Sequence, residues 1–125
     1  MIAQDVRNRS LVCDIVEWID ARGLRDDIAI YFNGNALATW NEWGGENGKE
    51  VLKGWYYYEN RNPRDYFMYC NPDTVSVSFE GTLNHYMNGY LNGWVEIYES
   101  FIDLPKPYGM FFEMGDSWNV SAYMV

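Results

Sequence analysis

Residues 28–40 read IAIYFNGNALATW, and this stretch decides the fold that we expect. Alternate side chains of an extended strand point to the same face of a sheet. One face therefore receives Ile28, Ile30 and Phe32. The Asn33-Gly34 dipeptide that follows strongly indicates a tight hairpin, because both turn positions tolerate positive φ. The stretch predicts two antiparallel strands, the second over residues 36–40.

Patterns on both sides of this hairpin predict the rest of the fold. Upstream, apolar side chains recur every three or four positions through residues 5–22, which is typical of an amphipathic helix. Gly23 suits the left-handed position that commonly ends a helix. Downstream, we expect a flexible glycine-rich connection over residues 42–48. Further strands are expected over residues 51–59, 66–70 and 74–79.

Residues 82–102 keep a helical period but contain two Asn-Gly pairs, at 88–89 and 92–93. A glycine inside a helix costs about 1 kcal/mol relative to alanine. We therefore predict one helix from 82 to about 90, a break near 92 and a second helix to about 102. A terminal hairpin is expected from strands over residues 108–113 and 118–123.

These elements predict one α+β domain spanning residues 1–125. Short turns between consecutive strands require antiparallel neighbours, since a parallel return needs a longer crossover. We expect a single twisted antiparallel sheet of about five to seven strands. The N-terminal helix and the second helical segment should pack on one of its faces.

Charge and composition exclude several classes of function. The chain has 9 Lys and Arg against 18 Asp and Glu, a net charge of −9, so a direct nucleic-acid or membrane partner is not expected. Aromatic residues make up 18% of the chain, which excludes the disordered class. No signal-peptide pattern and no run of roughly 18 apolar residues is visible, so we expect a cytoplasmic protein, in the host cytoplasm if a phage encodes it.

Catalytic and metal-binding patterns are missing from the sequence. His85 is the single histidine, and no nucleophile elbow, P-loop or zinc spacing occurs. Cys13 and Cys70 are interpreted as free, buried residues. We therefore expect no enzymatic activity, no cofactor and no metal. A carboxylate-based enzyme using Glu96, Glu99 and Asp103 is the weaker alternative.

The acidic charge is unevenly distributed along the chain. Residues 1–64 carry 8 basic and 10 acidic side chains, a net charge of −2, whereas residues 65–125 carry 1 basic and 8 acidic side chains, a net charge of −7. The second half therefore serves either solubility or a positively charged partner. A helical spacing places Glu96, Glu99 and Asp103 on one face. A short connection is expected to bring Glu113 and Asp116 into the same acidic patch.

The run Trp55-Tyr56-Tyr57-Tyr58 must place alternate rings on opposite faces of the sheet. If helices cover one face, one of the two pairs stands on the open face. We take Tyr56 and Tyr58 as that exposed pair. Exposed tyrosines are typical of protein interfaces, although a plain sheet surface or a platform for a sugar or base remains open.

In size, acidity and lack of catalytic groups, the chain resembles the small anti-defence proteins of phages and mobile elements, such as anti-CRISPR and antirestriction proteins, and bacterial immunity proteins. This resemblance is one of type and is shared by unrelated folds. It implies a non-enzymatic inhibitor of a basic nucleic-acid-binding protein, such as a nuclease or defence effector, in which carboxylates mimic phosphates and tyrosines pack against the partner. The alternative is a small-ligand module that binds a nucleotide or carbohydrate on a Tyr/Trp sheet face, with Arg61 and Arg64 available for a phosphate.

Overall fold

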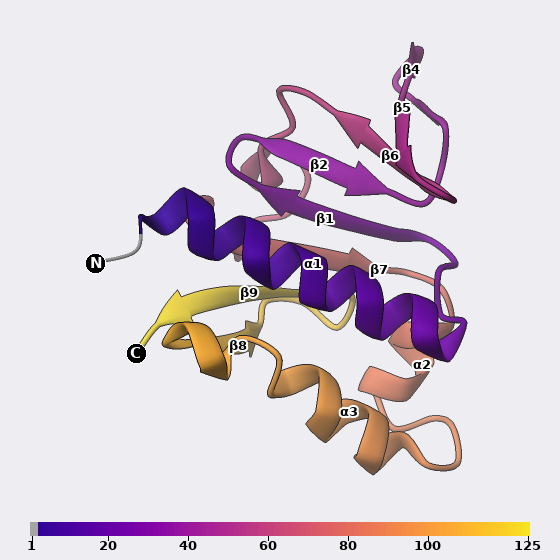
Figure 1. The fold of residues 1–125 in the computed structure, drawn as a ribbon. Coiled ribbons are helices and arrows are strands. Elements are labelled where there is room, and N and C mark those ends of the chain that lie inside the picture. Colours follow the sequence, from indigo (N-terminus) through magenta and orange to yellow (C-terminus); the bar gives the residue numbers. More distant parts are fainter. Residues whose placement is uncertain (1–2) are drawn as a thin grey trace.

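The computed structural model describes residues 3–125 and shows helices packed against a large antiparallel sheet (Figure 1). The helices are α1 (Gln4–Arg22), α2 (Thr82–Met87) and α3 (Trp94–Ile102), with short 3-10 helices η1 (Pro63–Asp65) and η2 (Lys106–Tyr108). The strands are β1 (Ile28–Phe32), β2 (Asn35–Ala38), β3 (Glu42–Trp43), β4 (Glu46–Asn47), β5 (Lys49–Leu52), β6 (Trp55–Tyr58), β7 (Val75–Phe79), β8 (Met110–Met114) and β9 (Asn119–Met124). The expected α+β class is confirmed.

Seven strands form one sheet in the order β5-β6-β2-β1-β7-β9-β8, and every pair is antiparallel. The β1–β2 hairpin turns at Asn33 and Gly34, whose φ angles of 51° and 80° are those that the dipeptide favours. Strands β3 and β4 form a separate two-stranded ribbon. The central position of β1 explains why the hairpin pattern predicts so much of the architecture.

Helix α1 runs across one face of the sheet, and α2 and α3 lie on the same side (Figure 1). The apolar stripe of α1 is buried against inward-facing side chains of β1, β7 and β9, and together these side chains form the main core. Gly23 ends the helix at φ 65°, and the N–H of Leu24 donates to the carbonyl of Ile19 at 3.1 Å, as in a Schellman motif. The N-terminal helix is thus confirmed, including its end. No helix among residues 3–125 is long and apolar enough to span a membrane.

The opposite face of the sheet, which we call the second face, is covered by loops. Small sheet residues, Ala29, Ala36 and Ala38, leave room there for aromatic rings that arrive from the β3–β4 ribbon and from residues 59–74. Phe67 is buried against Tyr31, with ring centroids 5.4 Å apart. The expectation of an open face is therefore wrong, because the connections supply a second layer.

Two expected strands are wrong. The strand over residues 51–59 is two strands, β5 and β6, because Gly54 at φ 81° turns the chain between them. Residues 66–70 do not form a strand: the Asn62 side chain accepts a hydrogen bond from the N–H of Arg64 and starts η1. The N–H of Phe67 then bonds to the carbonyl of Pro63, which keeps the chain curled. The glycine-rich connection contains the β3–β4 ribbon.

The break within residues 82–102 and the terminal hairpin are confirmed. Gly89 and Gly93 have φ angles of 80° and 78°, a backbone conformation that an α-helix cannot contain. Residues 88–93 therefore form a protruding connection between α2 and α3.

Candidate functional site

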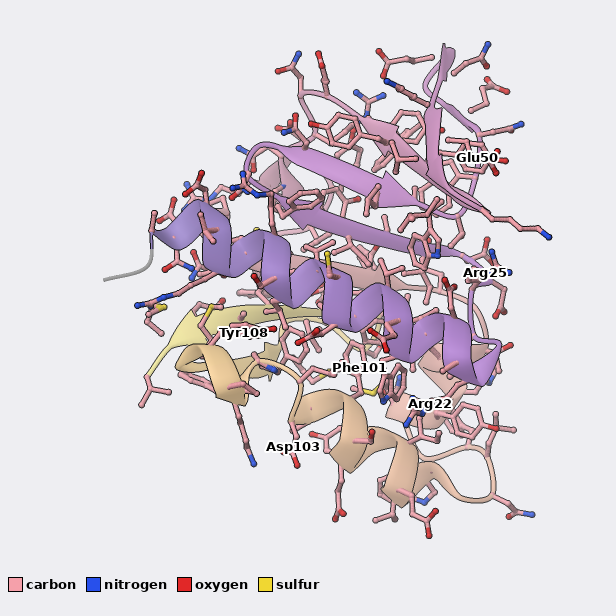
Figure 2. The ribbon with its side chains drawn as sticks, in the orientation of Figure 1. Arg22, Arg25, Glu50, Phe101, Asp103 and Tyr108 are labelled. Atoms are coloured by element: carbon pink, nitrogen blue, oxygen red, sulfur yellow. The ribbon has the colours of Figure 1, made fainter. Side chains whose placement is uncertain are left out.

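Helix α3 exposes three of the predicted acidic residues. Phe101 is fully buried, so its side of the helix faces the core, and Glu96, Glu99 and Asp103 are exposed on the side that faces away. Figure 2 shows Asp103 near the end of α3, on the side away from α1. Asp103 pairs with Lys106, 2.7 Å between Oδ1 and Nζ. Within residues 3–125, Glu96 and Glu99 form no ion pair.

Apolar side chains are exposed directly beside these carboxylates. Tyr90 is 74% exposed, and Leu91, Trp94 and Val95 are each more than a third exposed. Residues 89–96 also line a shallow depression of about 410 Å³. We call Tyr90, Leu91, Trp94, Val95, Glu96 and Glu99 the α3 surface. Sequence reasoning found its carboxylates but missed its apolar part, because Trp94 and Leu91 follow the same helical period as buried residues.

The remaining predicted acidic residues do not join the α3 surface as one patch. Glu113 is exposed on β8 and pairs in register with Ser121 on the second face, opposite the helices. Asp116 lies in the β8–β9 turn, where its carboxylate accepts from the Asn119 side chain at 3.4 Å. Alternation along β8 explains the separation, since Phe112 points into the helix-side core and Glu113 must point away.

Tyr56 and Tyr58 point to the second face, as alternation requires, but they are not an exposed pair. Tyr58 is 1% exposed, and its hydroxyl donates to the carbonyl of Trp40 at 2.8 Å. Burial raises the pKa of Tyr58. A Cβ at Gly48 would lie 2.6–2.8 Å from ring atoms of Tyr58 and from Tyr56, so the chain crosses closely over both. Tyr58 therefore serves the second-face packing, and Tyr56 is half-buried beside it.

The second face contains a pocket that the sequence did not predict. Its volume is about 300 Å³, and five aromatic residues line it: Tyr31, Trp40, Trp43, Tyr66 and Trp118. Ser78 and Glu80, at the end of β7, complete the lining. We call this cavity the aromatic pocket. Its rings come from four separate parts of the chain, with Trp40 and Trp43 close together on one of them, so no local motif could have indicated the pocket.

Arg61 is engaged beside this pocket. It pairs with Glu46 at 2.8 Å, and its guanidinium carbon lies 4.9 Å from the centroid of Trp43 and 5.2 Å from that of Tyr58. A further N–H donates to the carbonyl of Glu59. Because the terminal nitrogens of Arg61 already bond to these groups, and its Nε is buried without a hydrogen-bond partner in the described part of the chain, Arg61 is poorly placed to hold a phosphate together with Arg64, which is exposed.

The other candidate groups are scattered. His85 is exposed on α2, Cys13 is exposed on α1 and Cys70 is half-buried, so the expected burial of Cys13 is wrong. In the part of the chain that the structure describes, no group of three or more His, Cys, Asp or Glu side chains could hold a metal ion. No protein-family model matches the chain, and neither does any curated protein or solved structure.

Proposed function

We propose that this protein is a non-enzymatic binding protein whose α3 surface docks on a basic nucleic-acid-binding protein and inhibits it. One observation carries the proposal: Glu96 and Glu99, two carboxylates that form no ion pair within residues 3–125, adjoin exposed Trp94 and Tyr90. Aromatic anchors with a charged rim are common at protein interfaces. The net charge of −9 favours a positively charged partner, such as a nuclease or defence effector.

The α3 surface supports this reading better than a purely solubilising role. Solubility requires charge but not exposed aromatic side chains, which promote unwanted association. Here both kinds of side chain protrude together from the connection between α2 and α3 and from the first turns of α3. Carboxylates would replace the phosphates that the partner normally binds, and Trp94 would add specific packing.

The test compares two double charge reversals. E96K/E99K changes the α3 surface, and E17K/E59K changes the net charge equally at exposed positions elsewhere. Asp14 and Asp20 are unsuitable controls, because they accept hydrogen bonds from Tyr108 and Trp55. Each variant should change stability by only about 0.5 kcal/mol, as exposed substitutions usually do.

Partners are captured on the immobilised protein from a lysate of its host and then challenged with duplex DNA and with salt. We expect a basic nucleic-acid-binding protein that duplex DNA displaces, and that E96K/E99K binds about a hundredfold more weakly, since like charges then face each other. E17K/E59K should retain binding. Equal losses for both variants, or a partner that DNA does not displace, would contradict the proposal.

A second candidate function, small-ligand binding on the sheet, is favoured by the aromatic pocket. Its lining contains a carboxylate and no Lys or Arg side chain, which disfavours a nucleotide.

A further inference from the structure

We propose that the aromatic pocket binds a quaternary ammonium group, the trimethylated head group of an organic cation. The inference is independent of the proposed docking by α3. It starts from the five aromatic side chains of the lining and from the single carboxylate, Glu80, that accompanies them.

The rings that line the pocket are inclined to one another and in contact. Trp43 lies among them, with centroid distances of 5.3 Å to Trp40 and 5.2 Å to Tyr66 and interplanar angles of 66° and 51°. Tyr31 meets Trp43 at 77°. At centroid distances of 5.2–5.9 Å the rings touch one another, so a ligand in the pocket would meet the ring surfaces that border it and would not enter between two rings. A ring face carries the negative part of the quadrupole, which attracts cations.

The side chains that line the aromatic pocket are buried to different degrees. Tyr31 is 3% exposed on the central strand and forms the floor, where burial raises its pKa and keeps it a neutral phenol. Trp40, Trp43 and Trp118 are half-buried, and Tyr66 is 43% exposed at the rim. A rigid floor with an accessible rim is suited to admit a small group and surround it.

The charged side chains near the pocket favour a positively charged ligand. Glu80 is exposed and forms no ion pair with any residue of the described part of the chain. The nearby positive charge, Arg61, pairs with Glu46 at 2.8 Å and lies over the Trp43 ring, and it is not among the side chains that line the pocket. A cation therefore gains both from the aromatic faces and from Glu80, whereas an anion would meet an uncompensated carboxylate.

The volume of the pocket and the side chains that line it narrow the class of ligand further. A volume of about 300 Å³ lies at the lower end for ligand sites, so it fits a head group and not a large molecule. A primary ammonium group must replace its hydrogen bonds to water when it is buried, whereas five of the seven lining side chains offer an aromatic ring. A trimethylammonium group has no N–H to satisfy and presents methyl groups to the rings.

The experiment titrates the protein with choline and with 3,3-dimethylbutan-1-ol, a neutral molecule of the same shape. Calorimetry gives the affinities, and NMR follows the choline methyl resonance and the tryptophan indole N–H resonances. We expect choline to bind at least roughly tenfold more tightly than the alcohol, because cation–π attraction and Glu80 both need the charge. Enclosure by rings should shift the choline methyl resonance upfield.

Four variants locate the site. Tyr66→Leu removes an exposed wall and should weaken choline binding by about tenfold, whereas Tyr66→Phe keeps the ring and should retain it. Glu80→Gln should lose affinity for choline but not for the alcohol. Tyr69→Leu removes an exposed aromatic ring outside the pocket and should leave choline binding unchanged. Far-ultraviolet circular dichroism and a cooperative urea transition confirm folding of each variant.

A short peptide containing trimethyl-lysine distinguishes two sources of such a group, a modified protein side chain and a free small molecule. Tighter binding of this peptide than of choline assigns the group to a protein side chain, and the reverse order assigns it to a free small molecule. Equal affinity for choline and the neutral alcohol would overturn the proposal. So would a failure of choline to bind, including the case in which cellobiose binds in its place and reports a carbohydrate site.

Discussion

The two faces of the sheet are built from the same strands but by different kinds of packing. On the helix side, aliphatic and aromatic side chains of the sheet meet those of α1 and α3 in a fully buried core. On the second face, the sheet contributes small alanine and serine side chains beside Tyr31 and Tyr58, and further large rings arrive from connections. The comparison teaches that one face supplies stability, whereas the other keeps an accessible cavity.

The largest effect is expected from the same substitution made once on each face. Phe101 is fully buried, with ring centroids 5.1 Å from Trp18 and 5.2 Å from Phe112. Phe101→Ala should lower the free energy of unfolding by about 3–5 kcal/mol. The packed elements α1 and β8, which supply Trp18 and Phe112, cannot move in to fill the cavity. Phe67→Ala should cost about half as much, because its loop can move to fill part of the space. Urea denaturation measures both; equal losses would mean that the two faces form one core.

An intermediate effect is expected from the polar contact that links β7 and β9 on the second face. The buried hydroxyls of Ser76 and Ser121 are 2.7 Å apart on directly paired residues. Replacing either one with alanine should destabilise the protein by about 1 kcal/mol, because the remaining hydroxyl loses a partner. The double alanine variant should cost little more than a single one. Strictly additive losses in this double-mutant cycle would show that the two hydroxyls act independently.

The smallest effect is a pH dependence on the helix side. A hydrogen bond from the Tyr108 hydroxyl to the carboxylate of Asp14, together with burial, raises the pKa of Tyr108 to about 12. A tyrosine in the unfolded chain has a pKa of about 10. The folded state therefore holds the Tyr108 proton more tightly, and this contribution to stability is fully present below about pH 10. It is lost as pH rises from about 10 through 12.

The matched control for this prediction is Tyr108→Phe, which removes the titrating hydroxyl and keeps the ring. The difference in unfolding free energy between the wild type and this variant should shrink over the same pH interval. Asp14→Asn should lower the pKa of Tyr108, because it removes the carboxylate that accepts the hydrogen bond from the Tyr108 hydroxyl. A difference that stays constant with pH would show that the Asp14 contact has no role in stability.

Local sequence was sufficient wherever neighbouring residues decide the structure. The Asn33-Gly34 turn, the α1 stripe with its Gly23 end and the break between α2 and α3 depend on backbone preferences and on periodicity within a few residues. Alternation along residues 55–58 likewise assigned Trp55 and Tyr57 to one face and Tyr56 and Tyr58 to the other. Those preferences act through the local chain, so they can be read without the fold.

Tertiary structure alone decided which of these side chains are accessible and which meet. Alternation placed Tyr58 on the second face, but only the path of residues 40–48 and 59–74 buries it there. Glu113 is separated from α3 by the sheet itself, whatever the length of the connection between them. The aromatic pocket unites Tyr31, Trp43 and Trp118 from distant segments. Packing of connections against a sheet depends on contacts far apart in sequence, and no local pattern encodes them.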